Sequence, residues 1–124
     1  MTEASFAPVL EAVRAAGWST GVLDLAGVTG KAAFLERCAR ALDAPGWFGR
    51  NWDALADGLK DLSWLPAAPG RLLLAVGWQE YAAAQPAEWV TAQEVFAEAE
   101  AHWSGRPEGF AVLLAMGAAE ADRG

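Results

Sequence analysis

Three aspartates recur every fourth residue in the middle of the chain, at Asp53, Asp57 and Asp61. On an α-helix this spacing places the three carboxylates along one strip. Like charges so spaced repel by about 0.2–0.5 kcal/mol per pair, and Lys60 is expected to offset part of this as a neighbour of Asp57. The intervening apolar residues predict a helix from 52 to about 63 whose other side faces the core. These core residues are Trp52, Leu55, Ala56, Leu59 and Leu62. The strip fits either an ordinary solvated surface or a surface that binds a cationic partner.

Aromatic side chains gather immediately before this helix. Trp47, Phe48 and Trp52 lie within six residues of one another around Gly49, and Asn51 occupies the position expected for the helix N-cap. Aromatic residues beside charges are typical of the central part of a protein-binding surface. The alternative is that all three belong to the core of a chain that contains seven tryptophans.

Catalytic chemistry is weakly supported by the residue types. His102 is the only histidine, at the end of a predicted helix, and Cys38 lies on an apolar helix face where a buried thiol is expected. A magnesium site built from Asp53, Asp57 and Glu98 is conceivable because hard cations prefer carboxylates, but no further oxygen ligands stand out. We therefore expect a protein without enzymatic activity, without a cofactor and without a metal.

Apolar periodicity predicts the elements that must position these residues. Helical spacing covers five segments, at residues 5–16, 31–42, 52–63, 78–85 and 87–102. Ser5 and Thr29 are candidate N-caps, and Pro8 is expected in the first turn of its helix. Short apolar runs predict strands at 21–25, 71–76 and 110–114. Because each connection is long enough to hold a helix, the strands should be parallel.

The predicted fold is thus a single compact α/β domain, a three-stranded parallel sheet packed with helices. We expect an N-terminal helical extension over residues 1–20, the main domain over 21–116 and a flexible tail over 117–124.

Composition and charge limit the possible partners. With 124 residues, of which 54% are hydrophobic and 20% charged, the chain can bury one core. The net charge of −7 argues against direct binding to nucleic acid or to an anionic membrane, which attract basic surfaces, and favours basic protein partners. A single cysteine and a first segment unlike a signal peptide lead us to expect a cytoplasmic protein that is monomeric when free.

A longer motif surrounds the aspartates. Residues 47–59 read Trp-Phe-Gly-Arg-Asn-Trp-Asp-Ala-Leu-Ala-Asp-Gly-Leu. This segment resembles the signature of the barstar family, which is aromatic-aromatic-Gly-x-Asn-hydrophobic-Asp-Ala-Leu-x-Asp-x-Leu. The resemblance continues at Trp78, at residues 95–99 (Val-Phe-Ala-Glu-Ala) and in the closing apolar strand, and covers roughly residues 21–116.

The resemblance implies that the helix at 52–63 and the loop before it fill the active site of a barnase-like ribonuclease. Asp57 would enter the pocket for the RNA phosphate, Asp53 would pair with basic groups at the rim, and Glu98 would add a salt bridge from a neighbouring helix. Further contact area would come from Trp47, Phe48, Gly49, Asn51 and Trp52. Trp64 matches a family tryptophan only loosely, because two extra residues precede it.

The implied partner is a basic ribonuclease of the secreted type, bound before its secretion. The sequence departs from the best-known member at Arg50, Ala56 and Gly58, where an acidic, an aromatic and a cysteine residue are replaced. These changes bear on the identity of the partner more than on the mode of binding. The alternative function is a non-inhibitory acidic interaction module of the same fold that binds another basic protein.

Overall fold

Helices and strands follow one another in the predicted order. The computed structural model describes residues 2–46 and 50–115, the first six of them by their backbone alone. The elements are α1 (Thr2–Ala15), β1 (Ser19–Asp24), α2 (Lys31–Ala41), α3 (Trp52–Leu59), β2 (Gly70–Val76), α4 (Gln79–Ala84), α5 (Pro86–Trp103) and β3 (Gly109–Leu114). The predicted tail at 117–124 lies outside the described residues.

As predicted, the three strands form one parallel sheet, and their order in it is β1-β2-β3. The register pairs Ser19 with Arg71 across β1 and β2, and Gly70 with Gly109 across β2 and β3. The central strand β2 is buried on both faces along 72–75. A continuous apolar run is the expected sequence of such a strand, because neither face meets water.

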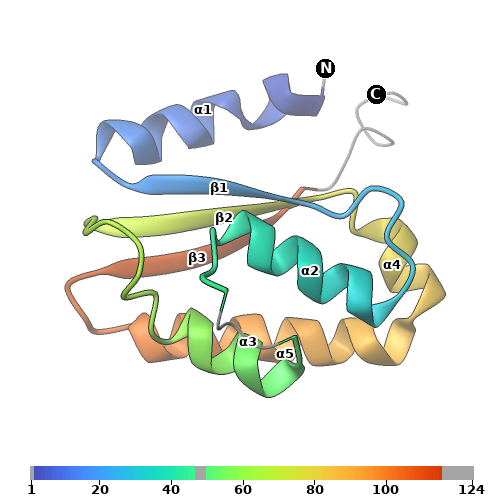
Figure 1. Ribbon diagram of the computed structural model, residues 1–124. Helices are drawn as coiled ribbons and strands as arrows, with labels where there is room; N and C mark the ends of the chain where they lie inside the picture. Colours follow the sequence, from blue (N-terminus) through green and yellow to red (C-terminus); the bar gives the residue numbers. More distant parts are fainter. Residues whose placement is uncertain (1, 47–49, 116–124) are drawn as a thin grey trace.

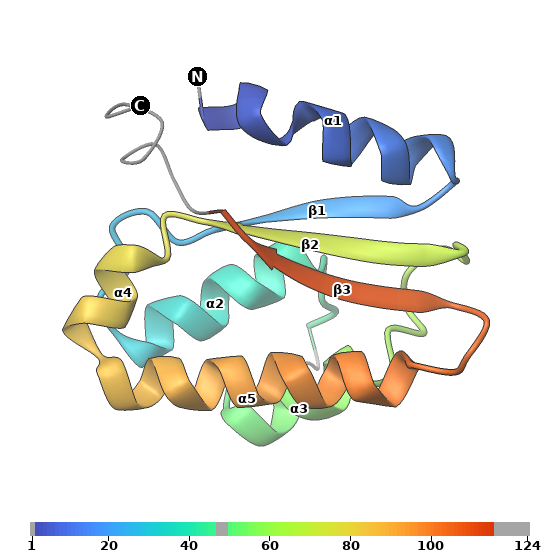
Figure 2. The same cartoon turned by 180° about the vertical axis from the view of Figure 1, so that it is seen from behind.

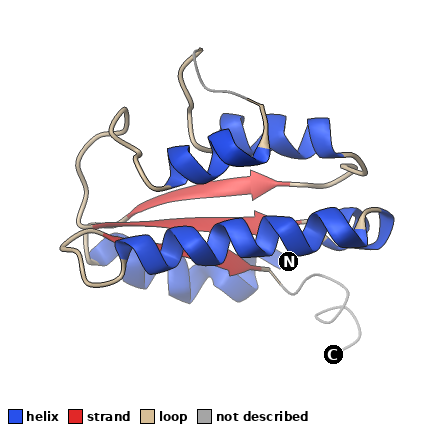
Figure 3. Cartoon of the chain, turned by 90° about the horizontal axis from the view of Figure 1, so that it is seen from below, coloured by secondary structure: helices blue, strands red, loops and turns tan. Residues whose placement is uncertain are grey.

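The sheet separates two helical layers. Helices α2, α3, α4 and α5 lie on one side of it and α1 lies on the other, as Figures 1 and 2 show from opposite directions. Figure 3 looks from the side of the four helices, where the long α5 crosses in front of the strands. Leu73 and Ala75 belong to the core beneath these helices, whereas the alternate residues Leu72 and Leu74 are buried outside that core cluster, on the side of α1.

Aromatic packing around Phe34 joins the four helices of the main layer. Phe34, in α2, is fully buried and stacks on Tyr81 of α4 with a centroid separation of 4.8 Å. Its ring also lies 5.5 Å from that of Trp52 in α3 and 6.5 Å and 6.3 Å from those of Trp89 and Phe96 in α5. One side chain thus contacts rings from α3, α4 and α5.

Two groups in this core have shifted proton affinities. Burial raises the pKa of Tyr81 to about 12, with smaller contributions from the nearby Glu88 and Cys38. Burial alone raises the pKa of the Cys38 thiol. The prediction that Cys38 is a small buried core residue is therefore confirmed.

The starts of two helices differ from the prediction. Helix α1 begins at Thr2, so Pro8 lies inside the helix and Ser5 is not its cap. The N-cap of α2 is Gly30, and no side chain caps that helix, so the assignment of Thr29 was wrong. The first hydrogen bond of α2 runs from the N–H of Phe34 to the carbonyl of Gly30 at 3.0 Å.

Helix α3 ends at Leu59, one turn before the predicted position. Its last turn closes with the N–H groups of Asp61 and Leu62 both donating to the carbonyl of Gly58 at 3.0 Å. Leu62 then adopts a left-handed conformation with φ 55° while its side chain is 2% exposed. Burial of the leucine side chain therefore offsets the steric cost of a conformation that L-residues rarely adopt.

Trp18 closes the end of the sheet where β2 and β3 begin. Its ring lies directly against the backbone of Gly70 and Gly109, so that a Cβ at Gly109 would come within 2.8 Å of the ring and one at Gly70 would overlap it. No other residue type fits at these two positions without moving the tryptophan. The contact thereby links the segment after α1 to both neighbouring strands.

We expect Gly70→Ala to destabilise the protein by about 1–3 kcal/mol, because the added methyl group overlaps the Trp18 ring. Urea denaturation followed by tryptophan fluorescence measures the change. Gly46→Ala is the matched control, since a Cβ at Gly46 meets nothing within 4 Å. Equal urea midpoints for Gly70→Ala and Gly46→Ala would show that the Trp18 ring moves aside without loss of stability.

Candidate functional site

Helix α3 begins as the sequence predicts. Asn51 has extended backbone angles, with φ −147°, and its side-chain Oδ1 accepts the N–H of Ala54 at 2.7 Å. This bond satisfies one of the first-turn N–H groups that the helix itself leaves unpaired. Asp53 lies in the same first turn, where a negative charge is favoured by the helix dipole.

The two sides of α3 divide as predicted. Leu55 and Leu59 are buried at 1% and 0% exposure, and Trp52 and Ala56 pack on the core at its margin. Leu62, beyond the helix, is also buried.

The carboxylates of Asp53 and Asp57 are exposed. Neither makes a hydrogen bond or ion pair within the part of the chain that the structure describes. Asp61 lies after the helix, where it accepts a hydrogen bond from Ser63 Oγ at 3.1 Å. The strip on α3 therefore contains two aspartates and not three.

Trp52 is held from three sides at the start of α3. Its Nε1 donates to Glu88 Oε1 of α5 at 2.9 Å, its ring packs on Phe34, and Lys31 Nζ lies 5.9 Å from the ring centroid. The side chain is half-buried, so part of it reaches the surface beside Asp53. These contacts to α2 and α5 fix the orientation of the first turn of α3 relative to those two helices.

Lys60 joins the end of α3 to α5. Its Nζ lies 2.8 Å from Oε2 of Glu98, a residue that the resemblance assigns to partner binding. We expected Lys60 to pair with Asp57, but the ion pair is formed with Glu98. The pKa of Lys60 is raised by its hydrogen bond to Glu98, against a smaller opposing effect of burial, and by the charges of Glu98 and Asp57.

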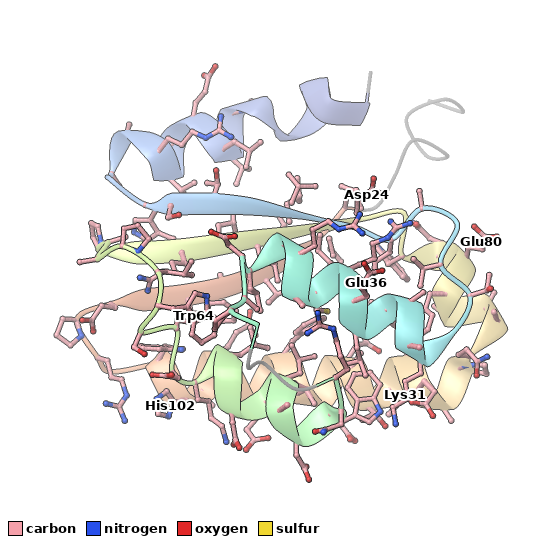
Figure 4. All side chains as sticks on the ribbon, in the orientation of Figure 1. Asp24, Lys31, Glu36, Trp64, Glu80 and His102 are labelled. Carbon is pink, nitrogen blue, oxygen red and sulfur yellow. The ribbon has the colours of Figure 1, made fainter. Side chains whose placement is uncertain are left out.

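Two tryptophans anchor the segment around α3 through their indole N–H groups. Trp64, which Figure 4 shows in the segment that follows α3, is half-buried and donates to the carbonyl of Leu42 at 3.0 Å. Trp103, at the end of α5, donates to the carbonyl of Leu59 at 2.7 Å. Sequence reasoning missed Trp103, because an indole at a helix end has no local pattern that identifies its hydrogen-bond partner.

Three of the predicted contact residues, Trp47, Phe48 and Gly49, lie outside the described residues. Arg50, one of the departures from the family signature, is exposed next to them.

The described residues contain no group of three or more His, Cys, Asp or Glu side chains placed to hold a metal. Glu98, one of the three carboxylates considered for magnesium, is paired with Lys60. His102, labelled in Figure 4, lies in the last turn of α5. The centroid of its ring lies 5.2 Å from that of Trp103. Among the described helices, none is both long and apolar enough to cross a membrane.

These features define a small α/β protein whose capped surface helix is fixed between two longer ones. The model of the family Barstar (barnase inhibitor) matches residues 18–115, which is most of the chain. The chain therefore belongs to the barstar family, whose members are inhibitors and not enzymes. Helix α1 precedes the matched region. No curated protein matches the chain in a sequence comparison.

We expect Asn51→Ala to lower the free energy of unfolding by about 1 kcal/mol, because the Ala54 N–H loses the side-chain acceptor that Asn51 provides at the start of α3. Asn51→Asp is the matched control, since aspartate offers the same acceptor and adds a favourable charge at the helix N-terminus. Chemical denaturation compares the two. An alanine variant as stable as the aspartate variant would contradict the capping role.

Proposed function

We propose that this protein inhibits a basic, barnase-type ribonuclease by covering its active site with the exposed side of α3. Membership of a family of barnase inhibitors supports the nature of the partner. The observation that carries the proposed mode of binding is that Asp53 and Asp57 are exposed on a helix whose opposite side is buried, with no internal cation paired to either carboxylate in the described part of the chain.

The chemistry of such a target explains why carboxylates on a helix suit it. A ribonuclease binds phosphate with fixed cations, and a carboxylate can accept charge-assisted hydrogen bonds from the same groups. Asp57, in the middle of α3, would take the place of the phosphate, and Asp53 would pair with cations at the rim of the pocket. Because α3 is already fixed by its cap and its buried side, little conformational entropy would be lost on binding.

The surrounding residues would complete the contact area. Trp52 is half-buried, and the exposed part of its indole lies next to Asp53. Asn51 and Trp64 flank the helix at its two ends. Trp47, Phe48 and Gly49 are proposed contact residues on the basis of the family signature alone. Glu98 would contribute from α5. The complex would form in the cytoplasm of the producing cell, before the nuclease is secreted.

The proposal is tested by titrating barnase with the purified protein while RNA cleavage is followed. We expect inhibition that is weakened by Asp57→Ala by about 2 kcal/mol or more, a threshold for dominant interface residues that derives in part from the barnase–barstar complex itself. Glu98→Ala should weaken inhibition less. Asp61→Ala is the matched control, because it removes the same charge four residues away and outside α3.

Two results would count against the proposal. Equal losses for Asp57→Ala and Asp61→Ala would mean that only net charge matters. Absence of inhibition of barnase and of other basic ribonucleases of its kind at micromolar protein would favour the alternative, an acidic interaction module that binds some other basic protein.

We also expect the association rate with the ribonuclease to fall steeply as salt is added. An acidic protein of net charge −7 attracts a basic one over distances of about 10 Å at 0.1 M ionic strength, and salt screens this attraction. Stopped-flow fluorescence between 0.05 and roughly 0.5 M salt measures the rate, a range chosen to span the screening of surface charges. A rate that does not change over this range would mean that the carboxylates do not guide the encounter.

A further inference from the structure

A lysine lies among the carboxylates of the proposed binding surface. Lys60 is the C-cap of α3, three residues after Asp57, and its ammonium group lies 2.8 Å from Glu98 Oε2 on α5. The Glu98 side chain is 58% exposed and that of Lys60 is 27% exposed, so the ion pair is at the surface while the lysine stem is largely covered. Asp57 contributes to the field at the same ammonium group.

This ion pair changes what Glu98 can offer to a partner. An arginine or lysine that approached Glu98 would find one carboxylate oxygen already hydrogen-bonded and a like charge beside it. Like charges brought together in an interface disfavour a partner, and this repulsion is a common source of specificity. Within the described residues, neither Asp53 nor Asp57 forms an ion pair, although Asp57 lies close enough to contribute to the field at Lys60.

Resting on the proposed function, we propose that Lys60 determines which ribonuclease is bound, by neutralising Glu98. The preferred partner then has fixed cations opposite Asp57 and Asp53 but no basic side chain opposite Glu98. A ribonuclease with a basic side chain opposite Glu98 gains little from it, because Lys60 already holds the Glu98 carboxylate. Such a ribonuclease is therefore bound less tightly than it would be if Glu98 had no ion-pair partner.

Because Lys60 acts through Glu98, the effects of substitutions at these two residues on inhibition should not be additive. In the natural chain, Glu98→Gln should weaken inhibition of barnase by about threefold, because one oxygen of the Glu98 carboxylate is already hydrogen-bonded to Lys60 and is not free to meet a cation of the partner. In a Lys60→Met background the carboxylate is released, and the same Glu98→Gln substitution should weaken inhibition by about tenfold or more, the effect of a close interfacial charge pair as known largely from barnase–barstar. Methionine keeps the length of the lysine stem and its packing.

The experiment measures inhibition constants of the natural chain, Lys60→Met, Glu98→Gln and the double variant against barnase. The matched control is the exposed ion pair on α2, in which Arg40 Nη2 lies 2.8 Å from Glu36 Oε2. Arg40→Met and Glu36→Gln change the net charge in the same way, away from α3 and α5, and should show no coupling. Thermal unfolding of all variants confirms that each remains folded.

Three outcomes are possible. Coupling between Lys60 and Glu98, with none between Arg40 and Glu36, supports the inference. Additive effects at Lys60 and Glu98, with barnase still inhibited, overturn the inference and leave the proposed function in place. Failure of the natural chain and of every variant to inhibit barnase and other basic ribonucleases of its kind overturns both.

Discussion

The position of α3 depends on the packing of Phe34. This fully buried ring of α2 contacts Trp52 at the start of α3, Tyr81 of α4 and two rings of α5. A helix of eight residues is not stable by itself in water, so tertiary contacts must supply what its length cannot. Aromatic pairs contribute about 0.5–1.5 kcal/mol each beyond their buried area. Without this cluster the backbone that carries Asp53 and Asp57 would have no fixed direction.

Polar contacts at the margin of the cluster complete this arrangement. Asn51 caps the first turn, Trp52 donates to Glu88 of α5, and Trp103 donates to the carbonyl of Leu59 in the last turn. These bonds are short and directional, and the two tryptophan bonds are partly protected from water, so each favours one orientation of α3. The apolar cluster therefore provides most of the stability, and the hydrogen bonds at both ends select the geometry. A surface so fixed loses little freedom when a partner covers it.

Local patterns in the sequence predicted most of the fold and the exposed part of the site. The order of elements, the parallel strands, the Asn51 cap and the buried side of α3 follow from periodicity and residue type, which act within a few residues. Contacts between distant segments could not be read in this way. Lys60 was assigned to Asp57, its neighbour in sequence, although its partner Glu98 is 38 residues away. The early end of α3 was also missed: the chain leaves the helical conformation before Leu62, which has φ 55° and is buried in the core.

The ion pairs at the proposed binding surface divide its carboxylates into two sets. Glu98 is connected to α3 through Lys60, whereas Asp53 and Asp57 have no hydrogen-bond or ion-pair partner in the part of the chain that the structure describes. Exposed carboxylates cost the free protein little, because water solvates them. Covering them with an uncharged surface would be costly, since a buried charge without a partner loses its hydration. In the proposed complex, only a surface with cations in matching positions would offset that loss, so selectivity would arise from which carboxylates the fold leaves unpaired and not from the net charge of the protein.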